Sequence, residues 1–117
     1  MLRKAMNDYY RSRIKELEIG FLFKQQDPDR ELELTISYIQ LEDYENASKY
    51  LNMYFDQFCK GDPDLNPVAY KYLAQIYLSQ GKEEIAYGFF RNYLKTKKDA
   101  ETEKIADEIK AKYKINY

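Results

Sequence analysis

Side chains of the same kind recur in this chain at a constant offset of 39 positions, from Leu34 to Leu73 onward. Within each copy, a leucine and a small residue precede a tyrosine, and an alanine then precedes a large apolar residue and a second tyrosine. The six matched pairs are Leu34 and Leu73, Thr35 and Ala74, Tyr38 and Tyr77, Ala47 and Ala86, Leu51 and Phe90, and Tyr54 and Tyr93. A repeat of this length has the size of one helix–turn–helix unit, so the pattern predicts two stacked helical hairpins.

The second copy resembles the tetratricopeptide repeat (TPR) family, whose units are pairs of antiparallel helices. The residues that carry this resemblance are Tyr70-x2-Leu73-Ala74-x2-Tyr77, the turn Ser79-Gln80-Gly81-Lys82, and Ala86-x3-Phe90. In the first copy, the segment that is similar to the turn between the two helices of the family's repeat is Leu41-Glu42-Asp43-Tyr44-Glu45-Asn46-Ala47. The chain departs from the family in three ways. Glu31 stands at an aromatic position, the closing proline is absent, and the offset is about five residues longer than usual.

Apolar spacing and capping residues predict the other helices. Steps of three and four residues form one apolar side of a first helix over residues 2–24, made by Leu2, Met6, Tyr10, Ile14, Leu17 and Phe21. Asp27-Pro28 and Asn66-Pro67 each place an N-cap residue before a proline, so a hairpin is expected to start at each. A last helix is predicted from Asp99, with a narrow apolar stripe of Ile105, Ala106, Ile109 and Tyr113. No segment alternates with period two, so no sheet is expected.

The sequence therefore predicts an all-α fold, a TPR-like antiparallel right-handed stack of helical hairpins (an α-solenoid) with about six helices. The 117 residues are expected to form a single TPR-like domain, 1–117. Its parts are an N-terminal capping helix (1–26), a first repeat (28–60), a second repeat (66–98) and a C-terminal capping helix (99–117). Packed helices require interlocking core residues, which predicts burial of Leu34, Tyr38, Ala47, Leu73, Ala74, Tyr77, Ala86 and Phe90.

The composition argues against catalysis and against a bound cofactor. The chain has no histidine, which removes histidine acid–base catalysis and histidine metal sites. Its single cysteine, Cys59, has no histidine to activate it, and the sequence contains no glycine-rich phosphate loop. The run Asp62-Pro63-Asp64-Leu65-Asn66 lacks the glycine and the glutamate of a calcium loop, so it is interpreted as a polar connection. We expect no enzyme activity, no metal and no cofactor.

The sequence also favours a cytoplasmic location. It contains no run of about 18 apolar residues, so no membrane contact is expected. The first residues lack the apolar core of a secretory signal. A single cysteine cannot form an internal disulfide, which fits a reducing compartment.

Charge is segregated along the chain, although the net charge is only −1. Residues 1–16 contain five basic and two acidic side chains, residues 17–66 contain four and eleven, and residues 67–117 contain ten and seven. This leaves two interpretations open: an ordinary solvated surface, or an electrostatic partner such as a second copy of the chain. The basic residues Lys110, Lys112 and Lys114 leave a nucleic-acid contact open as well, although acidic residues are interleaved with them.

The resemblance to TPR proteins implies a concave groove lined by the first helix of each repeat. On this chain the groove residues are Leu32, Ile36, Ile39 and Gln40 from the first repeat and Lys71, Tyr72, Gln75 and Leu78 from the second. Chaperone-adaptor TPR proteins bind a C-terminal carboxylate through lysine, arginine and asparagine, and this cluster is not matched, since Leu32 stands where a lysine is required. The groove floor is therefore expected to be apolar, and the first helix of the chain is an alternative occupant of it.

These observations predict a small adaptor or scaffold that binds a peptide segment or a helix of a partner protein. The alternative is a self-associating structural or regulatory subunit of a larger assembly. A further alternative, less favoured, is a nucleic-acid-associated accessory protein. Tyrosine is common at protein interfaces, and four tyrosines without an evident core position are candidates for one: Tyr9, Tyr72, Tyr87 and Tyr117.

Overall fold

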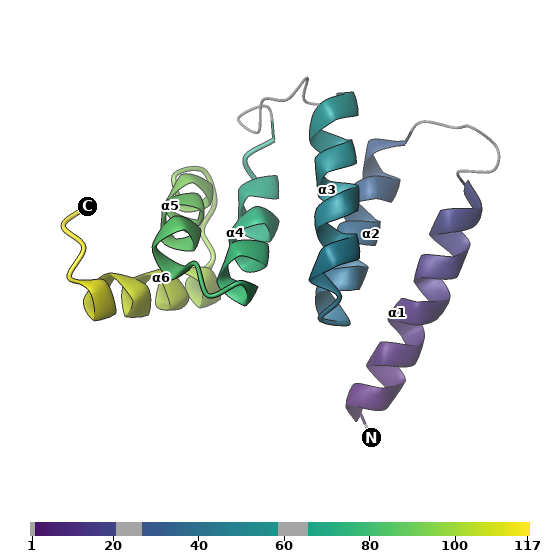
Figure 1. The fold of residues 1–117 in the computed structure, drawn as a ribbon, viewed down its shortest axis with the longest axis horizontal. Coiled ribbons are helices and arrows are strands. Elements are labelled where there is room, and N and C mark those ends of the chain that lie inside the picture. Colours follow the sequence, from purple (N-terminus) through teal and green to yellow (C-terminus); the bar gives the residue numbers. More distant parts are fainter. Residues whose placement is uncertain (1, 21–26, 59–65) are drawn as a thin grey trace. The chain divides into compact units, whose positions relative to one another are not determined.

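The computed structural model describes residues 2–20, 27–58 and 66–117. Within these residues the chain forms helices and turns without a strand (Figure 1). The helices are α1 (Leu2–Ile19), α2 (Pro28–Gln40), α3 (Tyr44–Phe58), α4 (Ala69–Ser79), α5 (Glu83–Leu94) and α6 (Ala100–Tyr113). The predicted all-α fold of helical hairpins is therefore confirmed. The chain divides into two compact units, Met1–Gly61 with α1 to α3 and Asp62–Tyr117 with α4 to α6.

In the first unit, α2 and α3 form an antiparallel hairpin whose helices begin at polar caps (Figure 1). The Asp27 carboxylate accepts a hydrogen bond of 3.0 Å from the backbone N–H of Asp29, and Pro28 occupies the first helical position. At the next turn, the Asp43 carboxylate accepts a bond of 3.2 Å from the N–H of Asn46 and so caps α3. The hairpin start predicted from the aspartate–proline pair is confirmed.

α1 packs along α2 in the same unit through an apolar cluster and polar bonds. The cluster has a buried residue from each helix, Ile14, Leu34 and Tyr50, surrounded by the partly buried Leu17, Tyr38, Leu41 and Met53. Arg13 donates to the Glu33 carboxylate with N–O distances of 2.5 and 3.0 Å. The Tyr38 hydroxyl donates to Glu18 at 2.5 Å. These contacts hold mainly the C-terminal half of α1.

At the end of α1, Gly20 lets the side chain of Arg30 approach the backbone. A β-carbon at Gly20 would lie 2.5 Å from Arg30 Nε, closer than nonbonded atoms allow. The glycine therefore makes room for Arg30, in addition to weakening the helix end. Three predicted features lie outside the described residues: residues 21–24 of the first helix, Cys59, and Gly61 as the cap of the third helix.

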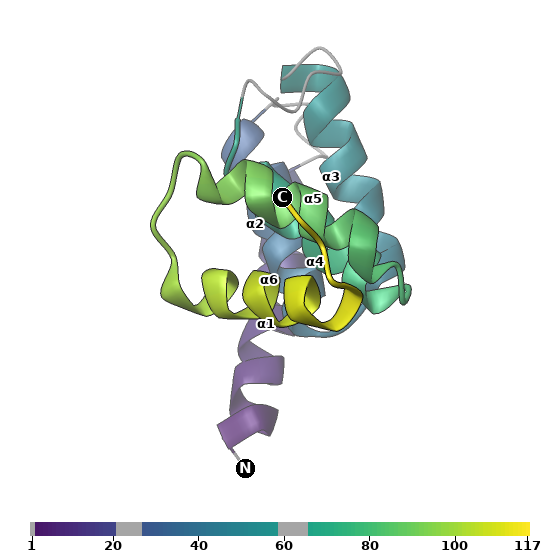
Figure 2. The same cartoon turned by 90° about the vertical axis from the view of Figure 1, so that its left-hand side faces the viewer.

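In the second unit, α4 and α5 form another antiparallel hairpin, and α6 packs against α5. Their shared core contains three alanines, whose short side chains let helices approach closely. The buried core residues are Ala74, Ala86, Tyr87, Phe90, Ala106 and Ile109. After α6 the C-terminal tail turns back over α5 (Figure 2), where the Tyr87 hydroxyl donates a hydrogen bond to the backbone carbonyl of Tyr117.

The start of α4 lies later than predicted, at Ala69 rather than at Pro67. Asn66 accepts a bond of 3.2 Å from the N–H of Val68, and the N–H of Ala69 bonds to the carbonyl of Asn66 at 3.0 Å. A tighter turn with three-residue spacing therefore precedes the α-helix. α6 begins as predicted, because the Asp99 carboxylate accepts a bond of 3.1 Å from the N–H of Thr102.

The core positions predicted from the repeat are partly confirmed. Five of them have no exposed area, namely Leu34, Ala47, Ala74, Ala86 and Phe90. The other three, Tyr38, Leu73 and Tyr77, are only partly buried. The two tyrosines stack on rings of the next helix, Tyr38 on Tyr50 with ring centroids 5.7 Å apart and Tyr77 on Phe89 at 5.4 Å. This stacking packs both rings although neither side chain is fully buried.

The buried alanine of α5 provides a stringent test of this packing. We expect Ala86→Glu to lower the free energy of unfolding by about 3 kcal/mol or more, because it places a carboxylate among packed helices. The measurement is urea unfolding followed by circular dichroism. Ala111→Glu, at an exposed alanine of α6, is the matched control and should change stability by less than about 0.5 kcal/mol. Equal stability of the two variants would contradict the assigned packing.

Candidate functional site

The first half of the predicted groove lies on one side of α2. Leu32, Ile36, Ile39 and Gln40 follow one another at helical spacing, so their side chains share that side of the helix. Ile39 is buried, Leu32 and Ile36 are partly buried, and Gln40 is exposed. This side therefore combines an apolar surface with a polar end.

α1 packs on α2 through other residues. Its contacts use Leu34 and Tyr38 in the apolar cluster and Glu33 in the bond with Arg13. At 100° per residue, Leu34 and Tyr38 point away from Leu32 and Ile36. The apolar contacts that hold α1 are thus made on a different side of α2 from Leu32 and Ile36, whereas Glu33, which binds Arg13, lies beside Gln40 at the edge of the predicted groove.

The second half of the predicted groove includes Lys71, which is engaged inside its own unit. Lys71 Nζ lies 2.9 Å from Asp99 Oδ2 and 5.7 Å from the ring centroid of Tyr93. The Tyr93 hydroxyl donates to the same carboxylate at 3.1 Å. Hydrogen bonds from Lys71 and from Thr102 hold the pKa of Asp99 well below its usual range. Lys71 therefore connects α4 to the start of α6, and its charge is neutralised by Asp99.

The other residues of this half differ in their surroundings. Leu78 packs against the apolar core of the second unit. Tyr72 and Gln75 are partly buried, and burial raises the pKa of Tyr72. Tyr72 and Gln75 are therefore the residues of α4 best placed to meet a ligand. The two halves of the predicted groove belong to different units.

Of the four tyrosines proposed for an interface, Tyr72 is partly buried, and the other three divide into exposed and buried residues. Tyr9 and Tyr117 are exposed, as an interface residue must be. The prediction for Tyr87 is wrong, because its side chain is only 1% exposed and forms part of the core of the second unit. Its place next to Ala86 turns it toward α6, a contact that the spacing within one repeat does not reveal.

Glu31 is a buried acid at the position where the TPR family has an aromatic residue. Its side chain is 2% exposed, and its Oε2 has no hydrogen-bond partner in the part of the chain that the structure describes. Burial raises the pKa of Glu31, and the nearby Arg30 opposes that rise. Sequence reasoning identified the unusual residue but not its burial, which depends on the packing of α2.

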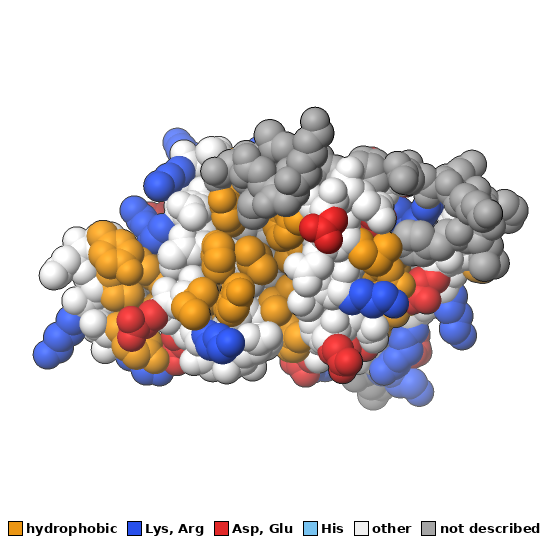
Figure 3. Space-filling model, turned by 45° about the horizontal axis from the view of Figure 1, so that its top comes forward, with side chains coloured by type: hydrophobic (Ala, Val, Ile, Leu, Met, Phe, Trp, Pro, Cys, Tyr) orange, Lys and Arg blue, Asp and Glu red, His pale blue; other side chains and the backbone are white. Residues whose placement is uncertain are grey.

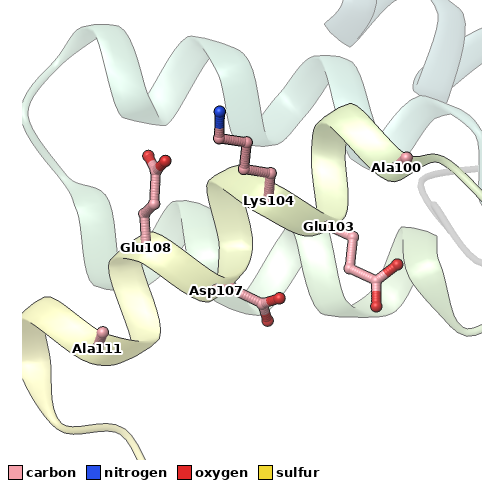
Figure 4. Close-up of a pocket in the computed structure, with 6 residues that line it drawn as sticks. All are labelled: Ala100, Glu103, Lys104, Asp107, Glu108 and Ala111. Carbon is pink, nitrogen blue, oxygen red and sulfur yellow. The ribbon is translucent and has the colours of Figure 1, made fainter.

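A hollow of about 470 Å³ lies on the outer side of α6. Figure 4 shows Lys104 and Glu108 pointing to one side of the helix, and Glu103 and Asp107 pointing to the other. Side chains that diverge in this way do not meet at one reacting atom or one metal ion. Among the residues described, no three of the metal-binding types gather where they could hold an ion. Asp62, Asp64 and Cys59 lie outside the described ranges.

The basic residues near the C-terminus are partly used in internal contacts. Lys112 Nζ lies 2.8 Å from Glu83 Oε1, and the Tyr113 hydroxyl donates to the same oxygen at 3.3 Å. Acidic and basic side chains both appear on the face shown in Figure 3, with hydrophobic side chains reaching the surface between them. That face therefore does not present the single-sign charge that favours a nucleic-acid backbone.

Comparison with protein-family models gives no match, and comparisons with curated proteins and with solved structures give no significant match either. None of the described helices has the length and apolar character needed to cross a membrane.

The buried Glu31 leads to a prediction with a defined pH dependence. The pKa of Glu31 in the folded chain lies above the ordinary value of 4.5. The stability that comes from burying the protonated carboxyl is therefore fully present below pH 4.5, and it is lost as the pH rises through the folded pKa and the carboxyl ionises. We expect Glu31→Gln to raise the free energy of unfolding by about 1 kcal/mol at about pH 7 and to have little effect at about pH 4. Urea unfolding at both pH values measures the difference.

The neighbouring Glu33→Gln is the matched control. It loses the charge-assisted bond from Arg13, so it should not stabilise the chain at either pH. Destabilisation by Glu31→Gln near neutral pH would show that the charged carboxylate is favourable where it lies.

Proposed function

We propose that this protein is a small TPR-type adaptor that binds a peptide segment or a helix of a partner protein. The observation that carries the proposal is the apolar side of α2, where Leu32 and Ile36 are partly exposed and α1 packs through other residues. A ligand that covers such a surface gains the free energy of removing apolar area from water. The proposal assigns the protein a binding role without catalysis.

The residues of the proposed groove specify the chemistry of the ligand. Leu32 and Ile36 offer apolar contact, and Ile39, on the same side of α2, is buried. In the first unit, Gln40 offers an amide group, which can donate to or accept from a peptide backbone. In the second unit, Gln75 offers the same group on α4. Because Asp99 neutralises Lys71, the proposal favours an apolar ligand segment over a free carboxylate.

The test of the groove is a double variant, one change in each half. We expect Ile36→Asp with Gln75→Ala to reduce capture of a partner by roughly tenfold or more, because a charge replaces an apolar contact and an amide is lost. The measurement is a pull-down with quantitative mass spectrometry. The helical circular dichroism and the melting temperature should remain those of the wild type.

The matched control is Ile19→Asp with Gln80→Ala, which makes the same chemical changes at exposed positions outside the groove. The control should leave capture of the groove partner unchanged. If the groove variant keeps its partner but melts at a lower temperature, Ile36 is a core residue and the proposal fails.

A second candidate function is self-association as a subunit of a larger assembly, and the exposed apolar residues of α1 favour it. Leu2, Met6 and Tyr9 are 77%, 44% and 60% exposed and lie on one side of the helix. In Figures 1 and 2 this N-terminal half of α1 extends past the end of α2. An apolar helix side of this kind is suited to packing against another helix.

Sedimentation over a concentration series tests this second function. If α1 mediates self-association, the molar mass rises with concentration, and Met6→Glu weakens the association by roughly tenfold or more. Ile19→Glu is the matched control, because Ile19 is 52% exposed on another side of the same helix. A constant monomer mass for the wild type would exclude self-association.

A further inference from the structure

The outer side of α5 carries a hollow that the proposed groove does not use. Its volume is about 500 Å³, and its lining includes Ile85, Gly88, Phe89, Arg91, Lys95 and Tyr117. All of these belong to α5 or follow it directly, except Tyr117, which the C-terminal tail brings back over the helix (Figure 2). The hollow lies on the side of α5 away from the core residues Ala86 and Phe90.

Gly88 lies on this side of the helix, and internal packing does not explain it. It occupies the middle of α5, where glycine is among the poorest helix formers. Within the part of the chain that the structure describes, a β-carbon built at Gly88 meets no atom within 4 Å other than its chain neighbours and the backbone of its own helix. At Gly20, by contrast, the side chain of Arg30 needs the space. A glycine on an open helix side allows the atoms of another molecule to approach the backbone closely.

The two walls of the hollow differ in their chemistry. Ile85 is 49% exposed and, with the partly buried ring of Phe89, forms an apolar wall. Two tyrosines of α4 stack on that ring, with centroid distances of 5.8 and 5.4 Å, and fix its position. Arg91 and Lys95 are exposed one helical turn apart and form a basic wall. Among the described residues, none that lines the hollow is acidic.

We propose that this hollow binds an acidic amphipathic segment of a partner protein. An apolar side chain of the segment packs against Ile85 and Phe89, and its carboxylates pair with Arg91 and Lys95. Charge complementarity selects an acidic partner, because two basic groups line the hollow without an acidic neighbour in it. The glycine allows the segment to lie close to the helix backbone, which brings both sets of contacts within reach.

The test uses the full chain and three fluorescent synthetic peptides of equal length. The first places glutamates around one leucine and one phenylalanine, the second has lysines in place of the glutamates, and the third has serines in place of the two apolar residues. Fluorescence anisotropy measures affinity, and amide NMR spectra locate the site. We expect the first peptide to bind at least roughly tenfold more tightly than the other two and to shift the signals of Gly88, Arg91 and Lys95.

Two variants separate binding from folding. Gly88→Leu fills the hollow, so it should weaken the first peptide by roughly tenfold or more while raising the melting temperature, because leucine is the better helix former. Lys95→Glu should weaken the same peptide without a change in melting temperature. The matched controls on α6 are Ala111→Leu and Lys104→Glu, both at exposed positions, and they should leave peptide affinity unchanged.

The proposal fails if the lysine peptide binds as tightly as the acidic one, or if the acidic peptide shifts only signals outside α5 and the tail. It also fails if Gly88→Leu lowers the melting temperature, since the hollow is then part of the core. If the molar mass of the wild type rises with concentration in the absence of peptide, and Gly88→Leu abolishes this rise, the occupant of the hollow is a second copy of the chain instead. The groove variant Ile36→Asp with Gln75→Ala should keep peptide affinity, which distinguishes this site from the groove.

Discussion

The close approach of helices at buried alanines is the constraint on which the rest of the second unit depends. Ala74, Ala86 and Ala106 come from three different helices, and none has exposed area. Small side chains at these points let the helices meet at short distance, and large ones such as Phe90 fill the remaining space. These contacts decide which sides of α5 and α6 face the core and which sides face solvent.

Charged pairs also connect the helices. The side chains in these pairs already have internal partners, so they are less available to a ligand. The Asp99 carboxylate accepts from Lys71 of α4, from Tyr93 of α5 and from the backbone of α6, so one side chain connects three helices. In the first unit, Arg13 and Glu33 connect α1 to α2 in the same way. Partly buried pairs of this kind fix the positions of the helices relative to one another more than they add to the free energy of unfolding.

The surfaces that remain have different chemistry, which is consistent with the binding role that we propose. One side of α2 is apolar with an amide at its end, whereas the hollow on α5 has an apolar wall and a basic wall. A helical hairpin scaffold can present both, because each helix has one side in the core and another toward solvent. Function in such a scaffold resides in the surface residues rather than in the fold.

The sequence by itself determined the helices, the two hairpins and the buried alanines. These features follow from helical periodicity and from local capping bonds, which involve residues only a few positions apart. Tertiary structure alone decided that Lys71 is neutralised by Asp99, that Tyr87 lies in the core beside Tyr117, and that no described side chain fills the space around Gly88. Each depends on residues far apart in the chain, or on the absence of any neighbour. Only the packing of whole helices brings such residues together or keeps them apart.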